Sequence, residues 1–138
     1  MSLFEWSSDY DLDIPQIDDQ HRELVAMINE LYAALKADDS GSIVDEILNR
    51  LLQYVEIHFE TEETSMRENH YPELDGHIFL HEVLREEVLD LKKLQLQGGE
   101  VATFELLNFL AEWLKNHIAN ADKMFGKYLH ERNYRNLL

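Results

Sequence analysis

Apolar residues recur at intervals of three and four along most of this 138-residue chain, and three short segments interrupt the pattern. The interruptions are "ADDSGS" at residues 37–42, "NHYPE" at residues 69–73, and Gly98-Gly99. Intervals of three and four place side chains on one face of an α-helix, whereas Gly and Pro tend to end helices. No long stretch alternates apolar and polar residues as a strand would. The sequence therefore predicts an all-α protein.

The lengths of the periodic stretches predict how the helices are arranged. We expect a single domain, residues 1–138, with helices at about 18–37, 42–69, 73–97 and 101–127. Helices of about 20 residues are each about 30 Å long, and short loops between them favour an antiparallel up-down-up-down four-helix bundle. Residues 1–17 contain Pro15 and lack a helical period, but their apolar residues predict an ordered N-terminal arm packed on the bundle. A tail is expected at residues 128–138.

The net charge of −16, from 12 basic and 28 acidic side chains, limits the partners of the chain. Such a charge repels phosphate groups and anionic lipids, so neither nucleic-acid binding nor membrane-surface binding is expected. The chain has no cysteine, which excludes disulfides and thiolate metal sites. Neither a signal peptide nor an apolar run long enough for a membrane span is visible, so we expect a cytoplasmic protein.

Most of the seven histidines continue the apolar faces of the expected helices. The five that do so are His21, His58, His77, His81 and His117. Residues four apart on a helix share a side, so His58 lies with Glu62, and His77 lies with His81. Asp122 follows His117 at a similar depth along the last helix. All four helices are therefore expected to direct imidazole groups, with two carboxylates, into one interior.

A single buried histidine is more often a hydrogen-bonded core residue than a metal ligand. Five imidazoles and two carboxylates in one core are different, because burying so many polar groups without partners would make the bundle unstable. Nitrogen and oxygen donors without sulfur favour iron, manganese or zinc, and seven donors exceed the four or so that one zinc ion takes. We therefore expect two metal ions, bridged by both carboxylates, with one coordination position open for a small ligand.

The spacing of His117 and Asp122 conflicts with a regular helix. Residues five apart lie about 140° apart around an ideal α-helix, so the two side chains could not face the same interior. A π-type bulge would bring them together, and such defects often occur at functional sites. The sequence predicts one between Ile118 and Asp122.

Several motifs together resemble the hemerythrin family, specifically the single-domain bacteriohemerythrins. They are "FEWSSDYDLDIPQIDDQH" at residues 4–21, His58-x-x-x-Glu62, His77-x-x-x-His81 and His117-x-x-x-x-Asp122. The resemblance covers nearly the whole chain and implies two non-heme iron ions joined by an oxo or hydroxo bridge. It implies that one iron is bound by His77, His81 and His117, the other by His21 and His58, and both by Glu62 and Asp122. It also implies an O₂ pocket lined by Leu24, Phe59, Trp113 and Ile118. Phe125 departs from the family pattern, in which Tyr is common.

The resemblance implies reversible O₂ binding for oxygen carriage, storage or delivery to an oxygen-consuming partner. We also expect a monomer that is not an enzyme. Three alternatives stay open. The chain could be an O₂ or redox sensor in which oxidation of the iron pair moves a helix or the arm. It could be a small diiron redox enzyme acting on peroxide or nitric oxide. It could also be a bundle in which the metal is purely structural.

Overall fold

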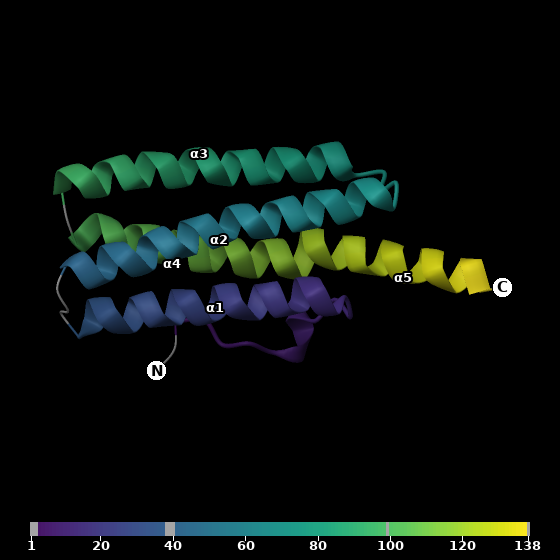
Figure 1. The fold of residues 1–138 in the computed structure, drawn as a ribbon, viewed down its shortest axis with the longest axis horizontal. Coiled ribbons are helices and arrows are strands. Elements are labelled where there is room, and N and C mark those ends of the chain that lie inside the picture. The colour runs from purple at the N-terminus through teal and green to yellow at the C-terminus, as the bar shows by residue number, and fades with distance from the viewer. Residues whose placement is uncertain (1–2, 38–40, 99, 138) are drawn as a thin grey trace.

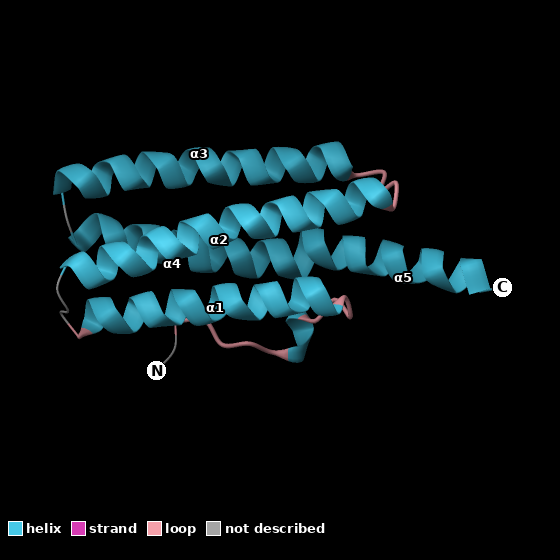
Figure 2. Cartoon of the chain, in the orientation of Figure 1, coloured by secondary structure: helices cyan, strands magenta, loops and turns pink. Residues whose placement is uncertain are grey.

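The computed structural model describes residues 3–37, 41–98 and 100–137 of the chain. Its α-helices are α1 (Pro15–Lys36), α2 (Gly41–Glu68), α3 (Leu74–Gly98), α4 (Glu100–His117) and α5 (Lys123–Leu137). A 3₁₀ turn, η1 (Ser8–Tyr10), lies in the arm, and a π-helical turn, η2 (Ile118–Asp122), joins α4 to α5. Every regular element of the described residues is helical (Figure 2). The all-α prediction is confirmed.

The helices form an antiparallel up-down-up-down bundle (Figure 1). Helix α1 packs against α2 and α4, and α3 packs against the same two helices, so the four surround one interior. Helices α4 and α5 continue through η2 as one long rod, whose α5 part extends beyond the ends of the other helices (Figure 1). The predicted four-helix architecture is confirmed.

The core consists of the apolar stripes that the sequence shows at intervals of three and four. Its fully buried members include Leu24, Ile28 and Leu31 of α1, Leu48 and Leu51 of α2, Leu84 of α3, and Leu106 and Leu107 of α4. Each such side chain contributes about 1.5–3 kcal/mol when it leaves water. This core holds the four backbones at fixed positions around the polar cluster described below.

The N-terminal arm is ordered and packs on the bundle, as predicted. Phe4 and Leu12 are buried in the core, with 1% and 4% of their surface exposed. The Asn29 side chain accepts a hydrogen bond from the Phe4 backbone N–H (3.0 Å) and donates one to the Phe4 carbonyl (2.8 Å). Paired bonds of this kind satisfy the backbone N–H and C=O groups of a segment that has no regular secondary structure.

Helix α1 begins at Pro15, three residues before the expected start at residue 18. Proline suits the first helical position because its missing N–H would be unpaired there anyway. Asp18 consequently lies inside the first turn, where its buried carboxylate accepts hydrogen bonds from the backbone N–H groups of Leu12 (2.9 Å) and Ile14 (3.3 Å). This aspartate fastens the arm to the bundle.

The expected tail at residues 128–138 is wrong for residues 128–137, because α5 continues to Leu137. The sequence after Gly126 contains neither Gly nor Pro, the two residues that most strongly end helices. The α5 rod is also held by the turn between α2 and α3, where the Tyr128 hydroxyl donates to the Asn69 carbonyl (2.8 Å) and Arg132 donates to the same oxygen. No helix among the described residues is long and apolar enough to cross a membrane.

Candidate metal centre

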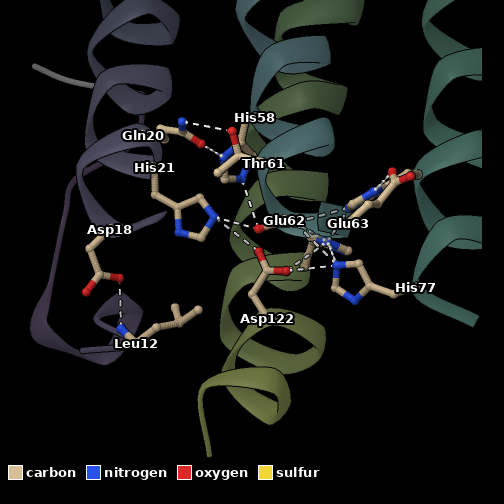
Figure 3. A network of polar contacts seen from close by, with 12 residues as sticks. Leu12, Asp18, Gln20, His21, His58, Thr61, Glu62, Glu63, His77 and Asp122 are labelled. Carbon is tan, nitrogen blue, oxygen red and sulfur yellow. Dashed lines mark hydrogen bonds and ion pairs between the residues drawn. The ribbon is translucent and has the colours of Figure 1, made fainter. Parts of the chain in front are cut away.

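The seven predicted donors come together in the interior of the bundle (Figure 3). They are His21 from α1, His58 and Glu62 from α2, His77 and His81 from α3, His117 from α4, and Asp122 from η2. All seven are buried, with at most 6% of their surface exposed. Each helix of the bundle thus contributes at least one donor.

The donors form two overlapping groups of four. One group contains Glu62, His77, His81 and His117, and the other contains Glu62, His21, His58 and Asp122. Within each group the donor atoms lie within 4.8 Å of one another, a spread that one metal ion could span. Because Glu62 belongs to both groups, the arrangement fits a dinuclear metal site.

Glu62 divides its two carboxylate oxygens between the groups. Its Oε2 lies 3.2 Å from His21 Nε2 and 3.0 Å from His58 Nε2. Its Oε1 faces the opposite way, 3.3 Å from His77 Nε2 and 3.2 Å from His81 Nε2. A carboxylate oriented in this way is placed to bridge two ions.

Asp122 divides its oxygens in the same sense. Its Oδ2 lies 3.2 Å from His21 Nε2, while its Oδ1 lies 3.0 Å from His77 Nε2 and 3.1 Å from His117 Nε2. Both carboxylates therefore lie between the imidazoles of α1 and α2 on one side and those of α3 and α4 on the other.

The π-helical turn η2 brings Asp122 into this position. It spans Ile118–Asp122 and confirms the bulge that the spacing of His117 and Asp122 predicted. Its i→i+5 hydrogen bonding widens the turn, so residues five apart approach the same face. In a regular α-helix Asp122 would point away from His117.

The outward-facing nitrogen of His58 has a defined partner. His58 Nδ1 lies 2.8 Å from Oε1 of Gln20, whose amide nitrogen donates to Thr61 Oγ1 at 3.2 Å (Figure 3). The Thr61 hydroxyl in turn donates to the Ile57 carbonyl. This chain fixes the amide oxygen of Gln20 towards His58, so Nδ1 carries the proton and the lone pair of Nε2 points into the centre.

His81 is oriented in the same way by a charged partner. Its Nδ1 lies 2.7 Å from Oε2 of Glu63, a carboxylate with 17% of its side chain exposed. A carboxylate acceptor polarises the imidazole more strongly than the amide of Gln20 does. The two groups of donors are therefore supported unequally, one by a neutral side chain and the other by an anion.

With the imidazoles oriented in this way, lone pairs of neighbouring donor atoms face one another. This arrangement shows whether the cluster suits a cation. His58 Nε2, an acceptor, lies 3.0 Å from an acceptor oxygen of Glu62 and has no hydrogen-bond partner. Both Asp122 oxygens likewise lack a partner with hydrogen-bonding geometry. A contact between two acceptors is repulsive in a buried site unless a metal cation or a proton lies between the atoms. The residues present therefore fit a pair of metal ions.

The pKa values of the buried histidines and carboxylates are also shifted in directions that favour positive charge inside the cluster. Burial lowers the pKa of His21 and of His117, but the adjacent carboxylates of Asp122 and Glu62 outweigh it and raise these pKa values to about 9 and about 10. The pKa of His77 is also raised by these carboxylates against the effect of burial. Burial raises the pKa values of Glu62 and Asp122, yet the nearby imidazoles bring both below the ordinary range. Without metal, the cluster holds protons in place of ions.

A small apolar cavity adjoins the cluster. Its volume is about 20 Å³, and Leu24, Phe59 and Trp113 are among its lining residues. The Phe59 ring stacks on His81 with centroids 3.8 Å apart, and Trp113 stacks on His117 at 4.2 Å. Ile118, the fourth residue expected in this pocket, is fully buried but does not line the cavity. Phe125 is also fully buried, against Tyr71.

Sequence reasoning missed Gln20 and Glu63. Gln20 lies 38 positions from His58, and Glu63 lies 18 positions from His81, so no local spacing relates them. Each does immediately neighbour a predicted donor in the sequence. A search for polar neighbours of candidate ligands would have found both.

A family model and the sequences of known proteins match most of this chain. The family model described as "Hemerythrin HHE cation binding domain" matches residues 12–129. A bacteriohemerythrin of Stenotrophomonas maltophilia is 34% identical over 91% of this chain and 81% of its own length. A bacteriohemerythrin of Methylococcus capsulatus is 31% identical over 94% of this chain and 98% of its own length.

Proposed function

Because the chain belongs to the hemerythrin family, we propose that it binds O₂ reversibly at two iron ions held by the buried histidines and carboxylates. One observation carries the proposal: Glu62 and Asp122 each turn one oxygen towards His21 and the other towards His77. Two side chains that bridge the same two groups define positions for two ions in one cluster.

The two groups offer different numbers of imidazoles. His77, His81 and His117 would hold one iron, whereas only His21 and His58 would hold the other. With both carboxylates shared, the group of His21 and His58 would offer its ion one donor fewer, which would leave room there for a small ligand. The iron pair, when bound, supplies the two electrons that reversible O₂ binding requires.

The apolar cavity favours reversible binding of O₂ over its chemical conversion. Leu24, Phe59 and Trp113 offer no side chain that readily gives up a proton, and a volume of about 20 Å³ holds one water-sized or diatomic molecule. Excluding water and proton donors lets a bound ligand leave unchanged, because side reactions of activated oxygen need both. The role we propose is therefore non-catalytic O₂ carriage, storage or delivery. We propose further that the protein is a cytoplasmic monomer that supplies an oxygen-consuming partner.

A sensor function is the second candidate, and the contacts of the arm favour it. Lys123, which directly follows Asp122, donates to the Asp9 carbonyl of the arm at 2.7 Å. His130 Nε2 lies 2.9 Å from the Leu12 carbonyl, so a second residue of the same rod also contacts the arm. A change at Asp122 upon oxidation would reach the arm through these bonds.

The test is to load the protein with ferrous iron without air and then admit O₂. Reversible binding predicts a visible charge-transfer band that appears with O₂ and disappears on deoxygenation over repeated cycles. Rapid one-way oxidation would contradict carriage and favour the sensor or redox-enzyme reading.

Iron content provides a second measurement. Glu62→Ala removes oxygens from both groups, so iron per chain should fall from two to one or none. Glu60→Ala changes an exposed residue of the same helix and should retain both ions. Two tightly bound ions in Glu62→Ala would refute the bridging assignment.

A further inference from the structure

A second hollow lies on the surface between α2 and α3. Its volume is about 220 Å³, and Leu52, Val88 and Leu89 are among its lining residues. Leu89 is 56% exposed, so this hollow, called here the α2–α3 cleft, opens to solvent. The proposed function gives no role to the cleft.

The cleft and the inner cavity share a wall. Val55 and Phe59 of α2 and Leu84 of α3 line both. All three side chains are apolar, and Phe59 stacks directly on the His81 ring. Small movements of these side chains would connect solvent to the inner cavity without displacing a helix.

Arg85 forms the polar rim of the cleft. Its Nε donates to Glu56 Oε1 across the two helices at 2.7 Å, and its guanidinium carbon lies 5.1 Å from the centroid of the Phe59 ring. The Arg85 side chain thus contacts the same Phe59 ring that stacks on His81. Glu56 is 56% exposed, and a second carboxylate, Glu63, lies 3.8 Å from Arg85 Nη2. The exposed pair with Glu56 is of a kind weak enough to break often.

We propose that small apolar gas molecules reach the inner cavity through the α2–α3 cleft, with the Arg85–Glu56 ion pair as its gate. The proposal rests on the proposed function in that it takes O₂ as the gas. Beyond the rim the walls are apolar, so water and anions would lose hydration without compensation, whereas a diatomic gas would lose almost none. The route therefore admits O₂ and excludes polar solutes.

Quenching of Trp113 fluorescence measures gas entry without any oxygen chemistry. Trp113 lines the inner cavity, and Trp6→Phe leaves it as the single tryptophan of the two in the chain. The full chain would be loaded with redox-silent zinc and excited at a wavelength that selects tryptophan. Trp113 is only partly buried, so iodide, a charged quencher, measures the quenching that reaches it directly from the surface. O₂ should quench the emission beyond that level.

Two kinds of variant change the route in opposite directions. Glu56→Gln weakens the gate and should raise the O₂ quenching constant by up to about fivefold, the factor that corresponds to about 1 kcal/mol. Leu52→Phe and Leu89→Tyr enlarge side chains on opposite sides of the cleft and should lower it. The matched control for the gate is Glu30→Gln, which breaks the exposed Arg50–Glu30 pair away from the cleft. The control for added bulk is Ile57→Tyr, at a residue 54% exposed.

The same variants, loaded with iron, separate this proposal from the proposed function. If the cleft is the route, O₂ association and dissociation rates change by the same factor, and the equilibrium constant stays the same. Quenching that responds as expected, in a protein whose iron form shows no reversible O₂ band, would support the route and overturn the function. Reversible O₂ binding with unchanged quenching constants in all three cleft variants would overturn the route and leave the function standing.

Discussion

Raising the pH should destabilise the metal-free protein, and this prediction tests the electrostatics of the centre. The pKa values of His21 and His117 in the folded state are about 9 and about 10, against 6.5 for an unperturbed histidine. A histidine whose pKa is raised by folding contributes its full stability below pH 6.5. That contribution is lost as the pH rises towards the folded pKa.

The size of the effect follows from the number of protons. Each proton that the folded chain holds and the unfolded chain lacks changes the free energy of unfolding by about 1.4 kcal/mol per pH unit. The protons of His21 and His117 alone should lower stability by up to about 2.8 kcal/mol per unit above pH 7. The pKa of His77 is raised as well, which adds to this fall. The carboxylates do not alter this slope, because the lowered pKa values of Glu62 and Asp122 place their own titration at acidic pH.

The assay is urea unfolding of the metal-free protein, followed by circular dichroism at pH 7 and pH 8. His117→Gln removes one of these protons and should reduce the slope by up to about 1.4 kcal/mol per pH unit. His70→Gln changes an exposed histidine in the turn after α2 and should leave the slope unchanged. Metal binding displaces the same protons, so metal affinity should rise over this range. A free energy of unfolding that is constant, or that rises from pH 7 to pH 8, would refute the reasoning.

Two substitutions test supporting contacts, one at the metal centre and one between the arm and the bundle. Gln20→Ala leaves the His58 N–H without its acceptor and should lower metal affinity by about 10–100-fold in a chelator competition, whereas Gln16→Ala, at an exposed position, should not. Asp18→Ala removes the acceptor of two backbone N–H groups and should lower the free energy of unfolding in urea by about 2 kcal/mol. The control is Asp19→Ala, at the exposed neighbouring residue, which should change that free energy by less than about 0.5 kcal/mol. Equal effects of the two aspartate variants would contradict the conclusion that Asp18 holds the arm on the bundle.

The sequence by itself determined the helices, the inward-facing histidines and the bulge. These features depend on local spacing, because an α-helix repeats every few residues and the face of each side chain follows from its position. Even η2 could be predicted, since a separation of five positions between His117 and Asp122 does not fit a regular helical turn. Local spacing was less informative at the ends of helices, where the expected tail proved to be part of α5.

Only the tertiary structure decided how the donors are shared and supported. The division of the Glu62 oxygens, the proton on His58 Nδ1 fixed by Gln20, and the contact of Arg85 with the Phe59 ring all join residues from different helices. Helical periodicity gives the direction of a side chain from its own axis, but it does not give the distance or rotation between two axes. Those are set by the packing of the whole core, and the site and its access route depend on them.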